Sequence, residues 1–122
     1  MKFEIKERVI GEGDWEKYNR GNDQLLLNGK IIGCCTKTDH NSFVIEVIEI
    51  CDEKLRGKGY GTVFVKIYEV LAKERKFKRI EADVDPLGKF AKERIKFWEK
   101  KCGFIKDKNK SSNNTWVYYR DL

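Results

Sequence analysis

The sequence predicts a mixed α/β (α+β) fold in which an antiparallel meander of strands is followed by a parallel β-α-β crossover. Three observations support this prediction. Apolar and polar residues alternate in several stretches of the first fifty positions, as they do in half-buried strands. Asn28-Gly29 is typical of a two-residue hairpin turn. Beyond residue 60 the apolar spacing becomes that of amphipathic helices, with a short strand between two helical stretches.

The antiparallel part is expected to contain four strands. They are predicted at residues 1–9, 24–27, 30–38 and 43–51. The Asn28-Gly29 pair joins the second and third strands, and residues 40–42 form the next turn. The polar segment 11–23 contains three glycines and holds at most a short helix at residues 15–18.

The crossover part begins with an amphipathic helix at residues 62–75, followed by a strand at 79–84. A second helix is predicted at 90–102, and Gly103 ends it because glycine readily takes positive φ. Residues 104–106 and 115–119 are strand-like, with a polar loop between them. Since strand, helix and strand follow one another from 43 to 84, the connection is expected to be right-handed and the strands parallel.

The length of 122 residues predicts a single domain, residues 1–122, with its own hydrophobic core. No segment resembles a signal peptide or a membrane span, so a cytoplasmic location is expected. The four cysteines contain no C-x-x-C pair, which favours reduced thiols. His40 is the only histidine and lacks ligand spacing to them, so no metal site is predicted.

The charge distribution is uneven along the chain. The net charge is +6, and residues 54–110 carry 18 Lys and Arg against 8 Asp and Glu. Two interpretations are open: a basic half that attracts an anionic ligand, or an ordinary solvated surface. Nucleic acid is not expected as a partner, because the basic residues are interleaved with apolar helix positions and no nucleic-acid motif is present.

The most informative segment is Arg-Gly-Lys-Gly-Tyr-Gly at residues 56–61, between a predicted strand and a predicted helix. Its glycines allow a tight turn whose N–H groups approach a ligand closely. The helix that follows directs unpaired N–H groups and the positive end of its dipole into the same space. Arg56 and Lys58 add positive charge. This combination is typical of phosphate binding.

The segment resembles the acetyl-CoA loop of the GNAT N-acetyltransferase superfamily, [QR]-x-x-G-x-[GA], which Arg56, Gly59 and Gly61 satisfy. Two further segments, 28–33 and 97–104, are similar to the family's second and third strands and to its later helix with a Gly-Phe pair. The resemblance covers about residues 24–120, in the family's order. It implies a sheet whose two central parallel strands splay apart.

The resemblance implies acetyl-CoA as the cofactor. The loop backbone and the helix start would bind the pyrophosphate, and the strand before the loop would pair with the pantetheine arm. Tyr60 is interpreted as a packing residue against cofactor or helix. The cofactor-binding residues expected from the resemblance are Ile50, Cys51, Arg56, Gly57, Lys58, Gly59, Tyr60, Gly61, Thr62 and Trp98.

Acetyl transfer to an amine requires loss of a proton from the ammonium. Glu46 and Glu49 are the candidate catalytic bases. Because they are three residues apart, a regular strand presents them on opposite faces unless a bulge intervenes. Deprotonation relayed by water is the alternative. Many family members carry a tyrosine as general acid where this chain has Glu99, beside Trp98, so no acid is assigned.

The resemblance implies acetyl-CoA and an amine acceptor as partners. The acceptor is a small molecule, a protein lysine or a protein N-terminus. Segment 11–23 is short for the acceptor cover of this family, so that side is expected to be open or completed by a second chain. A monomer or a homodimer is expected. The alternative function is a non-catalytic GNAT-like module that binds acyl-CoA or a protein partner.

Overall fold

The computed structural model describes residues 1–7 and 22–122. Their strands form one seven-stranded sheet in the order β1-β2-β3-β4-β5-β7-β6. The strands are β1 (Phe3–Lys6), β2 (Asp23–Leu27), β3 (Lys30–Asp39), β4 (Phe43–Ile50), β5 (Arg79–Val84), β6 (Ile105–Lys106) and β7 (Trp116–Asp121). The helical segments are a 3-10 turn η1 (Glu53–Leu55), helices α2 (Tyr60–Glu74) and α3 (Ala91–Lys96), and a π-helical turn η2 (Phe97–Lys101). The mixed α/β class is confirmed.

The first four strands form the predicted antiparallel meander. At the tip of the β2–β3 hairpin, Asn28 and Gly29 have φ angles of 51° and 79°. Two successive positive φ angles are what a type I′ turn requires, so this turn follows from the residue pair. The short helix predicted at residues 15–18 lies outside the described residues.

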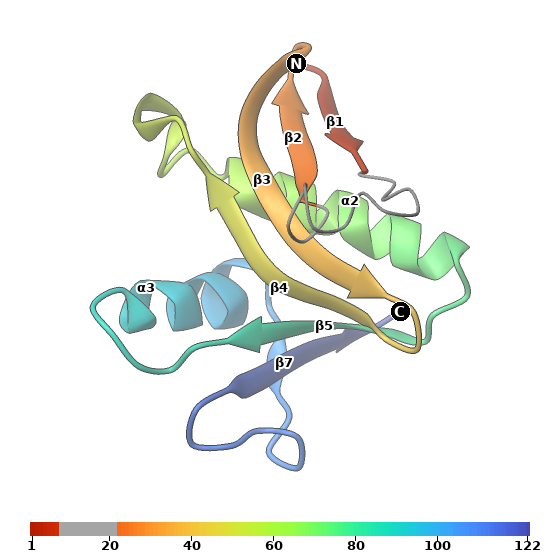
Figure 1. The fold of residues 1–122 in the computed structure, drawn as a ribbon, viewed down its shortest axis with the longest axis vertical. Helices are drawn as coiled ribbons and strands as arrows, with labels where there is room; N and C mark the ends of the chain where they lie inside the picture. Colours follow the sequence, from red (N-terminus) through yellow and green to blue (C-terminus); the bar gives the residue numbers. More distant parts are fainter. Residues whose placement is uncertain (8–21) are drawn as a thin grey trace, which may run out of the picture.

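β4 and β5 are parallel neighbours over only part of their length. They pair from Phe43 to Ile45 on β4 and from Ile80 to Ala82 on β5. Beyond Ile45 and Ala82 the two strands diverge, and Figure 1 shows α3 lying in the widening gap between them. The splayed sheet expected from the family resemblance is therefore present, at the predicted pair of strands.

β4 contains one extra residue relative to β3. Their register shifts between Thr36 and Lys37, which leaves Glu46 without a partner on β3. A β-bulge of this kind bends the strand and disrupts the regular alternation of faces. Before the bulge the odd-numbered residues of β4 are buried, and after it the even-numbered Ile48 and Ile50 pack against the core. Glu46 therefore lies where β4 parts from β5.

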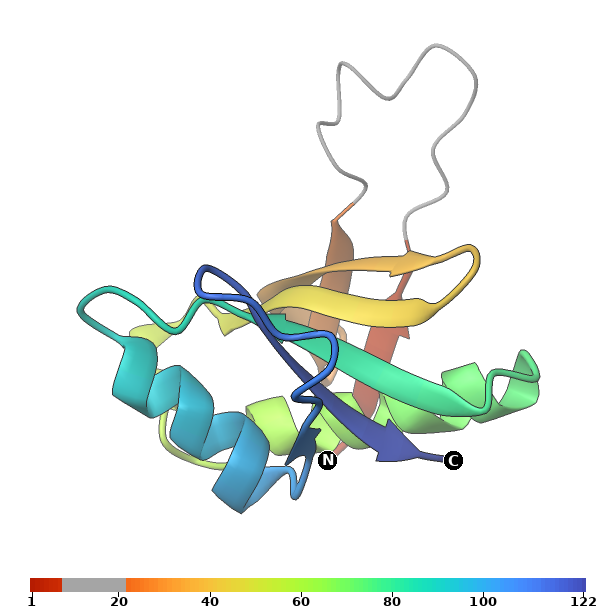
Figure 2. The same ribbon diagram turned by 90° about the horizontal axis from the view of Figure 1, so that it is seen from below.

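Helices α2 and α3 lie on the same side of the sheet, as Figure 2 shows. α2 forms the crossover from β4 to β5 and buries one apolar stripe against the sheet. Its buried residues are Phe64, Val65, Tyr68 and Ala72. The same core cluster includes Trp98 and Phe104 from the later part of the chain.

The helix boundaries differ from the predicted ones at two places. α2 begins at Tyr60, two residues earlier than predicted, because Gly59 takes a left-handed φ of 84° and ends the loop there. The helix predicted at 90–102 is divided into α3 and the π-helical turn η2. In that turn the N–H of Cys102 donates to the carbonyl of Phe97, five residues back, at 2.9 Å.

A network of charged side chains joins the end of β1 to β3 and α2. The side chain of Lys37 is 8% exposed and lies 2.8 Å from Glu7 and 3.3 Å from the buried Asp23. The Tyr68 hydroxyl donates to Asp23 at 2.7 Å. Arg75, just after α2, donates to both carboxylate oxygens of Glu7. These contacts connect the N-terminal strand to the rest of the fold.

None of the helices formed by residues 1–7 and 22–122 combines the length and apolarity required to cross a bilayer.

Candidate functional site

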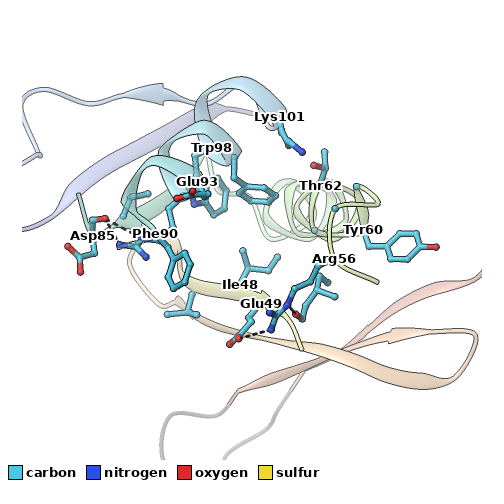
Figure 3. Close-up of a pocket in the computed structure, with 18 of the residues that line it drawn as sticks. Ile48, Glu49, Arg56, Tyr60, Thr62, Asp85, Phe90, Glu93, Trp98 and Lys101 are labelled. Carbon is cyan, nitrogen blue, oxygen red and sulfur yellow. Dashed lines mark hydrogen bonds and ion pairs between the residues drawn. The ribbon is translucent and has the colours of Figure 1, made fainter. Parts of the chain in front are cut away.

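A cavity of about 660 Å³ opens where β4 and β5 diverge. Its walls come from the second half of β4, the end of β5, the loop and first turn of α2, and the segment from the end of the β5–α3 loop through η2. Figure 3 shows that Ile48 reaches into this space from β4, whereas Phe90 and Trp98 reach into it from the segment that includes α3 and η2. These side chains give the middle of the opening an apolar lining, and the two ends of the opening are polar.

One end of the cavity is formed by the glycine-rich loop and the first turn of α2. Gly57 and Gly59 have φ angles of 76° and 84°, which residues with a Cβ rarely adopt. The first intrahelical bond runs from the N–H of Val63 to the carbonyl of Gly59, at 3.3 Å. The N–H groups of the three residues before Val63 thus have no partner within the helix. Within residues 1–7 and 22–122 no side chain caps Gly59, and no acidic residue lies in the first turn of α2, so this end is electropositive.

The third glycine of the loop has a different role. A Cβ on Gly61 would lie 3.1 Å and 3.3 Å from ring atoms of Phe97. The glycine therefore lets the first turn of α2 approach the π-helical turn closely. Tyr60 directs its ring away from Trp98 in Figure 3 and towards Phe3, with ring centroids 5.4 Å apart. Tyr60 accordingly packs against β1.

Arg56 ties the loop to the end of β4. Its Nε donates to the carbonyl of Ile50 at 2.8 Å. Its Nη2 lies 3.7 Å from Oε1 of Glu49, the ion pair drawn in Figure 3. The guanidinium is about half exposed. The loop cation is therefore held at the cavity edge and still faces solvent.

The backbone of β4 presents alternate residues to the cavity. The N–H of Cys51 donates to the carbonyl of Ile32 on β3 at 2.8 Å. Because antiparallel pairs alternate, the N–H and C=O groups of Ile48 and Ile50 point away from β3, towards the gap. The expectation that Cys51 offers a backbone group to a ligand therefore meets a structural obstacle, since its N–H already binds β3.

The other end of the cavity is acidic. Glu46, Asp83, Asp85 and Glu93 line it from β4, β5 and the β5–α3 region. Arg94 lies among them, but its guanidinium donates to the backbone carbonyls of Asp85 and Leu87. The cavity thus runs from an electropositive end at α2 to a carboxylate-rich end at the splay.

Asp83 is the half-buried member of this acidic group. Burial raises the pKa of its carboxyl above the usual 3.8. The neighbouring carboxylates of Glu46 and Glu81 raise this pKa further, and Lys110 opposes them. A carboxyl with a raised pKa is a stronger base when ionised. Sequence inspection did not single out Asp83, although a charged residue inside a strand that lines a predicted opening is a usable signal.

Trp98 and Glu99 lie in the π-helical turn η2 and have different surroundings. Trp98 lines the cavity and is 5% exposed, packed against Phe97 and Phe104 with centroids 5.1 and 5.0 Å away. Glu99 accepts a hydrogen bond from the Tyr118 hydroxyl at 3.2 Å. Burial, followed by the charge of Glu99, raises the pKa of Tyr118 to about 12. That phenol is therefore a weak proton donor at neutral pH.

All twelve predicted site residues lie in the described part of the chain, and ten of them line this cavity. Cys51 and Lys58 are the two that do not line it. Glu46 and Glu49 both border the cavity, because the bulge breaks the alternation that would otherwise separate them.

Solved structures share this fold over nearly its full length. Ard1 from Thermoplasma volcanium aligns with a TM-score of 0.68 at 16% identity, covering 100% of this chain and 99% of that one. A GNAT family acetyltransferase from Elizabethkingia anophelis with acetyl-CoA bound aligns with a TM-score of 0.68 at 16% identity, covering 98% of each chain. A Bacillus subtilis acetyltransferase in complex with CoA gives 0.65 at 17% identity, covering 99% of each.

A search of curated proteins found no significant match. The model of the acetyltransferase (GNAT) family matches residues 4–104. This range includes the diverging strands, the glycine-rich loop and the π-helical turn that enclose the cavity. The sequence match and the shared fold agree, and the chain belongs to the GNAT acetyltransferase family.

Proposed function

We propose that the chain is an acetyl-CoA-dependent N-acetyltransferase that transfers the acetyl group directly to an amine. The observation that carries this proposal is the polarity of the cavity. Arg56 and the start of α2 make one end electropositive, whereas Glu46 and Asp83 make the other end acidic. An anionic cofactor suits the first end and a cationic amine suits the second.

The α2 end fits the pyrophosphate of coenzyme A. The N–H groups of Tyr60, Gly61 and Thr62 precede the first intrahelical bond, and glycines in the loop keep the approach to them open. Arg56 adds a fixed positive charge at the cavity edge. The N–H and C=O groups of Ile48 and the N–H of Ile50 suit pairing with an extended pantetheine arm, whereas the Ile50 carbonyl already accepts from Arg56. Acetyl-CoA supplies the activated acetyl group as a thioester.

At the acidic end we assign proton removal to Asp83 and attraction of the ammonium to Glu46. Burial raises the pKa of Asp83, so its ionised form accepts a proton more readily than an exposed aspartate does. Glu46 is exposed and borders the same opening. Glu49 is less suited to this role because its carboxylate pairs with Arg56. Trp98 and Ile48 form apolar walls that exclude water from the reacting groups.

The second candidate is a GNAT-like module that binds acetyl-CoA without catalysis. One observation favours it: Glu99 stands where many family members carry a tyrosine acid, and it interacts with Tyr118. A thiolate with a pKa of roughly 8.5 leaves without much help, so the missing acid does not by itself prevent transfer. The acceptor in either case is a small amine, a protein lysine or a protein N-terminus.

Calorimetry with acetyl-CoA tests the first half of the proposal. We expect saturable binding to the wild-type protein and about tenfold weaker binding to Arg56→Ala, because a charge-assisted contact is lost. Lys54→Ala is the matched control: it removes an exposed basic residue outside the cavity and should bind within about twofold of wild type. Absence of binding at millimolar acetyl-CoA would refute the proposal.

Release of CoA with a panel of amines tests the second half. The enzyme should release CoA faster with at least one small amine or peptide than with buffer alone. Binding of acetyl-CoA without stimulated release by any amine class would instead support the non-catalytic module.

A further inference from the structure

Two cysteines and a carboxylate lie together on the outer face of the β3–β4 pair. Cys34 on β3 is directly opposite Glu49 on β4, and Cys51 follows Glu49 by two residues. Residues two apart on an extended strand share a face, so all three side chains point the same way. The two sulfur atoms and a Glu49 carboxylate oxygen all lie within 4.8 Å of one another. Three side chains that can ligate a metal ion thus converge at one point.

The backbone holds these three residues in fixed relation. Cys51 lies just beyond the end of β4, but its N–H donates to Ile32 at 2.8 Å and continues the ladder. Beside the cluster, β3 and β4 are so close that a Cβ on Gly33 would lie 2.2 Å from the Glu49 carbonyl oxygen. Cys34 is half-buried, whereas Glu49 and Cys51 are exposed. The site is therefore preorganised and open to ions from solvent.

We propose that Cys34, Glu49 and Cys51 bind one Zn²⁺ ion, with water as the fourth ligand. Zn²⁺ accepts thiolate and carboxylate ligands together in tetrahedral geometry, whereas Ca²⁺ and Mg²⁺ require oxygen ligands. With Zn–S bonds of about 2.3 Å, tetrahedral coordination separates two sulfurs by roughly 3.8 Å. Small side-chain rotations from the present arrangement reach that separation. Each thiol releases its proton to solvent as its sulfur binds the ion.

The surrounding charges support the same ion. Two thiolates and one carboxylate around a divalent cation leave one net negative charge. Arg56 lies 3.7 Å from Oε1 of Glu49 and supplies the compensating positive charge (Figure 3). Since a carboxylate has two oxygens, Glu49 can keep this ion pair and offer its second oxygen to the metal. Outer partners of this kind orient metal ligands.

A direct disulfide between the two cysteines is less suited to this geometry. Cys34 and Cys51 are diagonal neighbours across β3 and β4, a relation that separates Cα atoms by about 7–8 Å. Disulfides usually join Cα atoms about 4.4–6.8 Å apart. A shared metal ion spans the longer separation without moving the strands.

The test is a zinc titration of the full, reduced, metal-free protein in competition with a chromophoric chelator. We expect one equivalent of Zn²⁺ to bind to the wild type. Cys34→Ser and Cys51→Ser should each weaken binding by at least about 100-fold, and Glu49→Gln by about tenfold. Cys102→Ala is the control: it removes a buried thiol that is not in the cluster and should leave zinc affinity within about twofold.

Substitution with Co²⁺ gives an independent readout. The cobalt protein should show a thiolate-to-metal charge-transfer band and the visible bands of a four-coordinate ion, and both should disappear in Cys34→Ser. Circular dichroism of each variant establishes that it is folded. The inference is overturned if the wild type binds no stoichiometric zinc, or if both serine variants bind zinc as wild type does. Neither result depends on acetyl transfer.

Discussion

Glu46 and Asp83 border the same cavity, each one residue beyond the last position at which β4 and β5 pair with each other. The parallel pairing of β4 and β5 ends at Ile45 and Ala82, so these carboxylates flank the opening of the splay. Their proximity raises the pKa of Asp83 beyond the effect of burial alone. Two carboxylates at the opening of a cavity provide both an attraction for a cation and a base.

If Asp83 is the base, Asp83→Asn should lower kcat/KM by about 100- to 1000-fold, because a general base contributes about that much. The wild-type rate should rise with pH as Asp83 ionises, with a midpoint above 3.8 because Glu46 and Glu81 oppose ionisation and Lys110 compensates only in part. The measurement is a pH profile of kcat/KM. Asp121→Asn, on the neighbouring strand and exposed, is the control. Wild-type activity in Asp83→Asn would transfer the role to Glu46.

The same substitution should stabilise the protein at neutral pH. The folded state raises the pKa of Asp83, so it binds the proton more tightly than the unfolded chain does. Ionisation of Asp83 above that pKa therefore reduces the free energy of unfolding. We expect Asp83→Asn to raise Tm by roughly 1–4 °C at about pH 7. The difference should vanish near about pH 3, where both states bind the proton. A lower Tm at neutral pH would contradict this reasoning.

Tyr118→Phe should change turnover by less than about twofold. The Tyr118 hydroxyl donates to Glu99, and its pKa is raised to about 12, so it does not act as a proton donor to the departing thiolate at neutral pH. Because the side chain is fully buried, the loss of one hydrogen bond should instead lower the free energy of unfolding by about 1 kcal/mol. Steady-state kinetics and urea unfolding of the same sample separate the two effects. A large fall in kcat with normal stability would identify Tyr118 as an acid.

Glu7 should make stability depend on pH in the acid range. Hydrogen bonding to Arg75 lowers its pKa from 4.5 to about 2, with Lys37 adding to the effect. Since the folded pKa is depressed, the stabilisation is complete above the unfolded value of 4.5 and is lost as pH falls towards about 2. Allowing for solvent screening of this partly exposed group, Glu7→Gln should cost about 1–2 kcal/mol at neutral pH.

Urea unfolding of Glu7→Gln at several pH values measures this contribution. The variant should approach wild-type stability near about pH 2, where Glu7 is protonated in both states. Glu4→Gln is the matched control: it breaks an exposed ion pair with Lys2, at 3.6 Å, and should cost less than about 1 kcal/mol. A constant deficit for Glu7→Gln at all pH values would indicate lost packing instead.

Local sequence signals predicted most of the fold. Asn28-Gly29 determines its own turn. The strand predicted at residues 79–84 has the observed bounds, and Asp85-Pro86 marks its end in the sequence. The sequence also predicts the glycine-rich loop and α2, because glycine spacing and helical periodicity can be recognised within a short stretch of sequence. The predicted start of α2 was two residues late because Gly61 was assigned to the loop, although it belongs to the first helical turn.

The remaining features depend on contacts between distant segments. The bulge at Glu46 arises from the register between β3 and β4, and nothing in the β4 sequence alone marks it. The π-helical turn contacts α2 through Phe97 and β7 through Glu99, and local periodicity, which predicts a regular helix there, contains neither contact. The Cys34–Glu49–Cys51 cluster joins two strands and therefore has no ligand-spacing signature.

The extra residue in β4 divides the strand into two parts, and the numbering of the inward-facing residues differs between them. Upstream of Glu46 odd positions are inside, and downstream even positions are inside. Deletion of Glu46 would bring Ile45 and Val47 next to each other opposite Lys37 and Thr36, and the regular strand that results would still turn Ile48 and Ile50 inward. Such a deletion would therefore keep the core and the thiol cluster in place and remove only the bend of β4 and the carboxylate at the opening of the splay.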